Sequence, residues 1–235
     1  MKDLSGFDWG WMNGDDELAN FHKKNMIQEI FVRKQYEQFY KVKEGDVVVD
    51  IGASVGPFTY SIIDKNPKQV YCIEPDKASF EIMKKNLPNK NIININAGIS
   101  YKSGLVPMEL ENQVNFRELK NTFNVMTGIT FEDLIKDNNI DHINFLKIDC
   151  EGGEYDIFNN KNMEFLIDNV DNIVGEYHLS TPTLKTEFRY FRDKYLRYFK
   201  NIEVRAVCGT DIKWRLWNDD FVDFYNQIII HINNE

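Results

Sequence analysis

The sequence predicts an α/β protein whose mostly parallel sheet is covered by helices on both faces. Three observations lead to this fold class. Short β-branched and aromatic runs alternate with segments of helical spacing. The run at residues 47–51 is β-branched on successive positions, as in a strand that is buried on both faces. Only an irregular loop joins the last two runs, so we expect that pair to be antiparallel.

The segment before the first strand is expected to contain one helix. Residues 1–16 are irregular, whereas residues 17–40 place apolar side chains at helical spacing. Gly45 and the acid after it end this helix. We therefore interpret residues 1–40 as a tail and helix that cap a single domain, which spans residues 41–235.

Seven strands are expected after this segment, with helices between most of them. The strands are residues 47–51, 70–73, 91–95, 143–148, 173–175, 202–207 and 227–232. The helices are residues 57–65, a segment that Asp76 caps and that ends before Pro88, a short helix that begins at Thr130 with Asp133 in the capping-box position, and residues 184–198. Residues 100–125 fit either strand or loop.

Composition and charge exclude several protein classes. The chain has 235 residues, of which 43% are hydrophobic and 28% charged, and these globular values exclude a disordered or collagen-like chain. A net charge of −9 disfavours binding to phosphate backbones and to anionic membranes, so we expect no nucleic-acid and no membrane partner. Whether the chain forms a homo-oligomer is left open.

The cysteines and the N-terminus favour a cytoplasmic protein. The three cysteines are scattered and form no CxxC pair, which favours reduced thiols over a zinc site. The N-terminus lacks the apolar region of a secretory signal, and no apolar stretch is long enough to span a membrane.

A glycine turn follows the first strand and resembles a nucleotide-binding turn. Gly52 and Gly56 let the backbone approach a ligand closely, and the next helix offers unpaired N–H groups. Glu74 ends the next strand, where a carboxylate can accept hydrogen bonds from both ribose hydroxyls. Asp50 and the turn suit the amino-acid tail of S-adenosylmethionine (SAM).

Two alternatives to a SAM site remain at this turn. A nicotinamide dinucleotide would need G-x-G-x-x-G, and Ser54 and Pro57 stand at the second and third glycine positions. The motif alone can also be a plain strand-to-helix turn without a ligand. The position of Glu74 favours the SAM site over both.

A second group of acidic residues lies at the ends of later strands. Asp149 and Glu151 follow the strand at residues 143–148, and Glu176 and His178 end the next one. Carboxyl ends of parallel strands share one edge of the sheet, so we expect these side chains to face the glycine turn. Carboxylates so close can raise a pKa and provide a general base, and His178 is a further candidate base.

This group also fits two roles without catalysis. Asp149, Glu176 and His178 can hold a hard divalent ion, although no spacing enforces one, so we predict no metal site. Glu154 suits a solvated acidic loop that caps a helix N-terminus at least as well as it suits a catalytic role.

These motifs resemble the FkbM-type family of SAM-dependent methyltransferases. The matching segments are VVVDIGASVGPFTY (47–60), VYCIEPD (70–76), INAGIS (95–100), ITFEDLI (129–135), FLKIDCEGGEYDIF (145–158) and IVGEYH (173–178). The resemblance implies a class I methyltransferase fold, which has a seven-stranded sheet with a terminal antiparallel hairpin.

The resemblance also implies roles for single residues. Around the cofactor, the methionine part would be lined by Asp50, Gly52, Ala53 and Gly56, the ribose would be held by Glu74, and the adenine would lie near Pro75, Asp76, Gly98 and Ile99. Asp149 would lie near the transferred methyl. Gly98 stands at a position where members of this family more usually have valine or isoleucine.

The predicted function is SAM-dependent O-methylation of a hydroxyl on a small molecule or sugar. The alternatives are a SAM-binding module without catalysis and, less favoured, a nicotinamide-dependent oxidoreductase. The loop before the last strand carries acids and tryptophans that suit a sugar acceptor, although packing against the sheet edge or a partner subunit explains the tryptophans as well. These residues are Asp211, Trp214, Trp217, Asp219 and Asp220.

Overall fold

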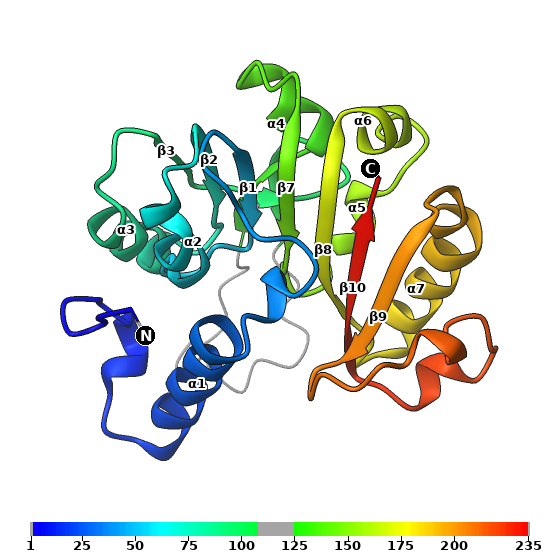
Figure 1. The fold of residues 1–235 in the computed structure, drawn as a ribbon, viewed down its shortest axis with the longest axis horizontal. Coiled ribbons are helices and arrows are strands. Elements are labelled where there is room, and N and C mark those ends of the chain that lie inside the picture. Colours follow the sequence, from blue (N-terminus) through cyan, green and yellow to red (C-terminus); the bar gives the residue numbers. More distant parts are fainter. Residues whose placement is uncertain (1, 108–124, 235) are drawn as a thin grey trace.

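A seven-stranded sheet forms the centre of the protein in the computed structural model, which describes residues 2–107 and 125–234 (Figure 1). The strand order is β3-β2-β1-β7-β8-β10-β9, and β10 pairs antiparallel with both β8 and β9. The strands are β1 (Val47–Ile51), β2 (Gln69–Ile73), β3 (Ile92–Ile95), β7 (Ile143–Ile148), β8 (Val170–His178), β9 (Asn201–Ala206) and β10 (Gln227–Asn233). The predicted fold class and the antiparallel last pair are confirmed.

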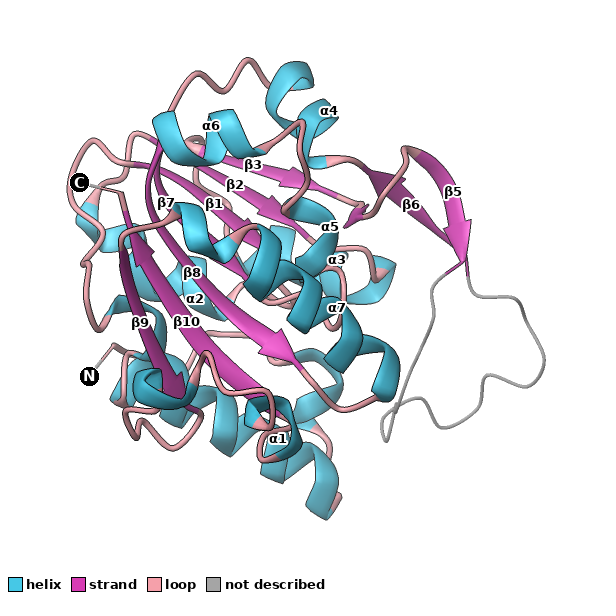
Figure 2. Cartoon of the chain, turned by 90° about the vertical axis from the view of Figure 1, so that its right-hand side faces the viewer, coloured by secondary structure: helices cyan, strands magenta, loops and turns pink. Residues whose placement is uncertain are grey.

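Helices cover both faces of this sheet, because successive residues of the central strands point to opposite faces and both are apolar (Figure 2). Val49 belongs to the core under one set of helices, and Val48 belongs to the core under the other. The first set is α4 (Phe131–Asp137), α5 (Glu154–Ile157), α6 (Met163–Asp168) and α7 (Pro182–Lys194). The second set is α2 (Pro57–Ile62) and α3 (Lys77–Asn86) together with the N-terminal segment.

The single helix expected over residues 17–40 is wrong in its second half. Helix α1 spans Glu17–Ile27 and continues as a π-helical turn, Gln28–Val32. Lys34 then adopts a left-handed conformation with φ 49°, which no helix can continue, and a short 3-10 turn follows at Gln35–Glu37. The chain therefore bends toward the edge where the parallel strands end.

The helix caps read from the sequence are present. Asp76 accepts a hydrogen bond from the N–H of Ser79, and Thr130 accepts one from the N–H of Asp133. The second half of the predicted capping box is not made. Ser103 replaces it, because its hydroxyl accepts from the Thr130 N–H and contacts the Asp133 carboxylate.

A small second sheet accounts for part of the region left open between residues 100 and 125. It contains β4 (Gly98–Ile99), β5 (Gly104–Pro107) and β6 (Val125–Ile129), and it stands beside the main sheet (Figure 2). Residues 108–124 lie outside the described residues.

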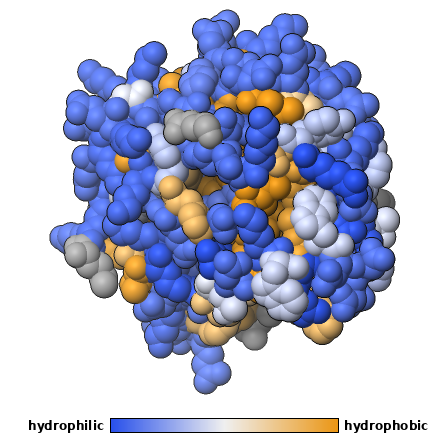
Figure 3. Space-filling model, turned by 45° about the vertical axis from the view of Figure 1, so that its right-hand side comes forward, coloured by the Kyte–Doolittle hydropathy of each residue, from blue (hydrophilic) through white to orange (hydrophobic). Residues whose placement is uncertain are grey.

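The surface is hydrophilic over most of the face shown in Figure 3, where apolar surface gathers in a hollow near the centre. Among the helices of the described residues, none has both the length and the apolarity that a membrane span requires.

Candidate functional site

The glycine turn and the acidic motif lie in direct contact. Gly52 has φ 73°, and a Cβ added to it would lie 1.6 Å from the carbonyl oxygen of Asp149. Only glycine can occupy this position, because any side chain would overlap the neighbouring backbone. The two motifs, about a hundred residues apart in the sequence, therefore form one site at the carboxyl ends of β1 and β7.

Glu74 is held at the end of β2 by the backbone on both sides. One carboxylate oxygen accepts a hydrogen bond from the N–H of Ser54 at 2.8 Å, and the other accepts from the N–H of Asp76 at 2.8 Å. Burial raises the pKa of Glu74 to about 7, although both hydrogen bonds oppose the shift. This carboxylate is thus fixed beside the glycine turn, and each oxygen retains a lone pair for a further donor.

Lys147 is a site residue that the sequence analysis missed. It lies beside Asp50 in the register of β7 and β1, and its Nζ is 3.1 Å from Asp50 Oδ1 and 3.7 Å from Asp149 Oδ2. It also donates to the carbonyl oxygen of Gly52 at 2.8 Å. Burial disfavours its charged form, but Asp50 and Asp149 outweigh burial and raise the pKa of Lys147. The signal was a lysine in an apolar strand, two positions before Asp149 and so on the same face.

Asp149, Glu176 and His178 meet on the other side of the site. Each offers one ligand atom, and these atoms lie within 4.8 Å of one another, so the three can hold a divalent ion. Gln35 donates to Glu176 at 3.2 Å and Gln227 donates to it at 2.7 Å. Burial, together with Asp149, raises the pKa of Glu176 to about 8.

His178 is oriented by Glu154, which the loop after β7 buries completely. Glu154 Oε1 lies 2.6 Å from His178 Nδ1, and its other oxygen accepts from the N–H of Gly152. Burial lowers the pKa of His178, but Glu154, Glu151 and Asp149 outweigh it and raise the pKa to about 10. The interpretation that Glu154 belongs to a solvated acidic loop is therefore wrong, because its side chain is buried. It does describe Glu151, whose side chain is 84% exposed although it lies 3.3 Å from His178 Nε2.

Gly98 lies where a side chain has no room. A Cβ there would lie 2.5 Å from the sulfur of Met126 and 3.3 Å from the Cβ of Pro75. Met126 thus fills the space that the more usual valine or isoleucine would take. Ile99 and Ala53 are buried beside the site, and their contacts with a cofactor stay predictions.

Most of the tryptophans lie away from the core. Trp9 is buried against Phe7 and Phe31, but Trp214 and Trp217 are exposed on the loop between β9 and β10. Trp214 is 75% exposed, so burial against the sheet edge does not explain it, whereas Trp217 is 47% exposed and its ring lies 5.7 Å from the guanidinium of Arg197. The sugar platform on this loop stays a prediction.

The charges of the site suit a cationic ligand. The strand ends carry four acids, Asp50, Glu74, Asp149 and Glu176. Among the described residues, Lys147 contacts Asp50 and Asp149, and His178 contacts Glu151 and Glu154 beside them. SAM carries positive charge on its sulfonium and its amino group, and its ribose offers two hydroxyl donors. The residues present therefore fit SAM: the acids attract its charge and Glu74 can accept from its ribose.

Comparison with known proteins decides the family. Residues 50–202 match the model of the methyltransferase FkbM domain, which is more than half of the chain. The chain belongs to the FkbM family of SAM-dependent methyltransferases. In this methyltransferase the matched residues include both motifs of the site. The match begins after the N-terminal segment that contributes Gln35.

Other comparisons give more distant relatives. Ribosomal RNA small subunit methyltransferase A of Persephonella marina is 34% identical over 82 residues, which cover 32% of this chain and 31% of that protein. The protein of the same name from Hydrogenobaculum sp. is 23% identical over 144 residues, which cover 61% of this chain and 54% of that protein. The chain thus spans about a third to a half of the curated relatives that it matches.

A solved structure shares the fold. The crystal structure of a fibrillarin/Nop5p complex matches with a TM-score of 0.52 and 14% identity, covering 89% of this chain and 82% of that chain.

The expectation that nucleic acid is excluded as a partner is wrong. Two curated relatives of this methyltransferase are ribosomal RNA methyltransferases. The net charge of −9 misled the sequence analysis because it sums over the whole chain, whereas nucleic acid binds to a local surface.

Proposed function

We propose that the protein transfers the methyl group of SAM to a hydroxyl oxygen. The acceptor that we favour is a small molecule or sugar. One observation carries this proposal: Asp149 lies against the glycine turn, and its side chain is still 28% exposed. An ionised carboxylate at that place can receive a hydroxyl donor next to the cofactor. An oxygen acceptor must lose a proton during transfer, and a carboxylate is a suitable base.

The roles proposed for the chain follow from these positions. Bound SAM supplies an electrophilic methyl group on a sulfonium. Asp149 orients the acceptor hydroxyl and takes its proton, while Lys147 and the glycine turn hold Asp149 in place. Glu176 lies deeper and is held by two glutamines, so its part is to set the charge of the site together with His178. Alignment of the acceptor with the methyl group provides much of the rate.

Calorimetry with SAM and S-adenosylhomocysteine, with and without EDTA, tests the cofactor site first. Binding that EDTA does not change supports a metal-independent site, and loss of binding or transfer with EDTA favours a divalent ion at Asp149, Glu176 and His178. A screen with methyl-labelled SAM then compares sugars and other hydroxylated small molecules. No binding under either condition contradicts the proposal.

RNA methylation is the second candidate function, and the names of the two curated relatives favour it. The same screen therefore includes ribosomal RNA fragments. Transfer of label to RNA alone would favour this candidate over a small-molecule acceptor.

Glu74→Gln is expected to weaken SAM binding by about tenfold at pH 8, the effect of losing a hydrogen bond to a charged group. Both ribose hydroxyls must donate, so the ionised carboxylate binds SAM better than its protonated form. The pKa of Glu74 is raised to about 7, so the affinity of the wild type should rise as the pH increases through 7. Calorimetry at several pH values should show this rise for the wild type and for an exposed control, Glu81→Gln, but a smaller rise for Glu74→Gln, in which only Glu176, whose pKa is raised to about 8, still loses a proton in this range.

A further inference from the structure

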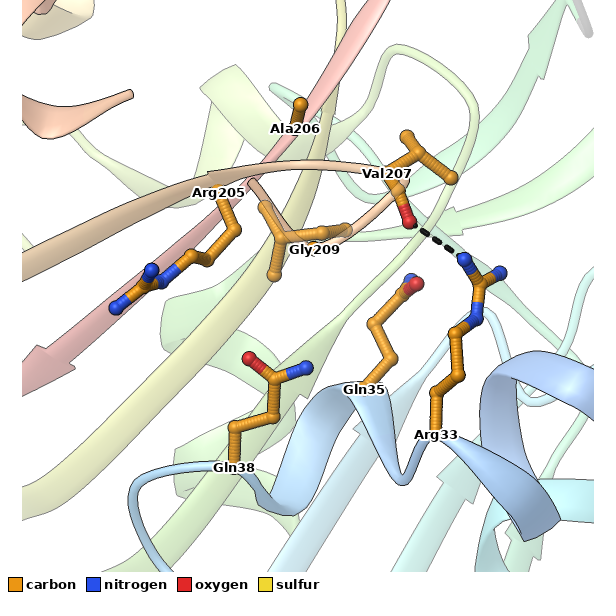
Figure 4. Close-up of a pocket in the computed structure, with 8 residues that line it drawn as sticks. Arg33, Gln35, Gln38, Arg205, Ala206, Val207 and Gly209 are labelled. Atoms are coloured by element: carbon orange, nitrogen blue, oxygen red, sulfur yellow. Dashed lines mark hydrogen bonds between the residues drawn. The ribbon is translucent and has the colours of Figure 1, made fainter. Parts of the chain in front are cut away.

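The acceptor side of the site is closed by a segment that the family match does not include. Residues 28–38 lie between α1 and β1, before the matched residues 50–202. Arg33 Nη1 donates to the carbonyl oxygen of Val207 at 2.8 Å, and so fastens this segment to the loop after β9 (Figure 4). In the same view Gln35 and Gln38 line a small cavity between the segment and that loop. This wall is therefore built by residues that lie outside the matched range.

Tyr36 reaches from this segment into the centre of the site. Its phenol hydroxyl lies 2.8 Å from Asp149 Oδ2, to which it donates, and 3.4 Å from Glu176 Oε2. The side chain is only 4% exposed, and its ring packs edge-on against Phe58 with 5.7 Å between the centroids. Burial and the two carboxylates raise the pKa of Tyr36, so the hydroxyl keeps its proton and stays a donor.

The contact leaves the two oxygens of Asp149 in different surroundings. Oδ2 receives the phenol and faces Lys147, whereas no residue in the described parts of the chain donates to Oδ1. Because packing fixes the phenol ring, the hydrogen bond also fixes the rotation of the carboxylate. Oδ1 is then the carboxylate oxygen that can accept from the hydroxyl of the methyl acceptor. The protein, and not solvent, fixes the direction in which Oδ1 points.

We propose that Tyr36 is a positioning residue for methyl transfer, which holds Asp149 so that Oδ1 faces the acceptor hydroxyl. This inference rests on the proposed function of Asp149 as the group that takes the acceptor proton. It adds that part of the reaction centre comes from the N-terminal segment, outside the FkbM domain match. A base that is free to rotate loses the alignment on which the rate of transfer depends.

The chain offers a matched control in Tyr40. Its hydroxyl donates to Asp46 Oδ2 at 2.9 Å, so Tyr40→Phe also removes a phenol–carboxylate hydrogen bond. Asp46 precedes β1, at the opposite end of this strand from the site. Tyr36→Phe and Tyr40→Phe therefore delete the same group at two places, of which only one contacts Asp149.

With an acceptor from the screen, Tyr36→Phe should lower kcat on the order of ten- to a hundredfold, the factor for losing a hydrogen bond to a charged group. KM for SAM and for the acceptor should change by less than about threefold, because the lost contact aligns the base and does not bind substrate. Tyr40→Phe should keep the wild-type kcat. A merely structural role would lower the stability of both variants without this selective loss of kcat.

Several results would overturn the inference. One is an unchanged kcat in Tyr36→Phe while Asp149→Asn is inactive. Another is a lower KM for the acceptor at unchanged kcat, because the phenol would then compete with the acceptor for Asp149. Full activity of Asp149→Asn would instead defeat the proposed role of Asp149 as the base, on which this inference rests.

A second measurement needs no acceptor. In urea unfolding of Tyr36→Phe, Asp149→Ala and the double variant, the two losses of stability should not add, because each single variant removes the one hydrogen bond that the two residues share. Additive losses would show that this bond is absent in solution and would overturn the inference.

Discussion

Asp149→Asn is expected to reduce methyl transfer by roughly a hundredfold to ten-thousandfold, the range for losing a general base. The amide has nearly the shape of the carboxylate, so its one oxygen can still accept the hydrogen bond that Asp149 Oδ2 accepts from Tyr36, but the amide cannot take a proton. Lys147 keeps Asp50 as its partner at 3.1 Å, so the variant leaves no buried lysine unpaired. The fold and SAM binding should therefore survive.

The measurements are the initial rate with methyl-labelled SAM and the SAM affinity by calorimetry. Asp64→Asn is the control, because it removes one carboxylate whose side chain is 76% exposed and lies in the 3-10 turn after α2. The control should keep the wild-type rate. Equal rates for Asp149→Asn and the wild type would remove Asp149 from the mechanism and leave the acceptor proton to another group.

Gly52→Ala is expected to destabilise the protein by more than about 3 kcal/mol or to prevent folding, because two costs combine. The left-handed backbone, at φ 73°, costs an L-residue about 1–2 kcal/mol. In addition, the new Cβ would lie 1.6 Å from the carbonyl oxygen of Asp149, so the ends of β1 and β7 would have to move apart. Urea unfolding followed by circular dichroism measures the loss.

Gly45→Ala separates these two costs. Gly45 has φ 87°, but a Cβ there meets no atom within 4 Å. This variant should lose only about 1–2 kcal/mol, the cost of the backbone conformation alone. If both variants lost the same stability, the contact between the glycine turn and Asp149 would not be as close as the structure shows.

The sequence could predict the fold because its signals are local. The β-branched run at β1 and the cap at Asp76 each lie within about ten residues, and such signals predicted the seven strands of the main sheet in the correct order, although they missed the short helices α5 and α6. The failure at residues 28–40 has a local cause as well. Apolar and charged residues alternate there at a spacing compatible with a helix, but the helix changes to a π turn at Gln28 and ends before Lys34, whose conformation is left-handed.

Part of the site could be predicted in the same way. Asp50, Glu74, Asp149 and Glu176 end parallel strands, and such ends share one edge of a sheet. Lys147 carried a signal that was available, since a lysine in a buried strand needs a carboxylate partner. The roles of all these residues in catalysis and cofactor binding stay predictions until the variants above are measured.

The sequence by itself determined the fold class, the alternation of strands and helices along the chain, the glycine turn and the acids at the strand ends. It could do so because periodicity and residue chemistry act over a few positions. Only the tertiary structure decided which groups meet. Tyr36 and Asp149 are 113 positions apart, and Glu154 is buried against His178, 24 positions away. Such contacts depend on how the N-terminal segment and the loop after β7 pack onto the sheet edge, and packing over these separations leaves no periodic trace in the sequence.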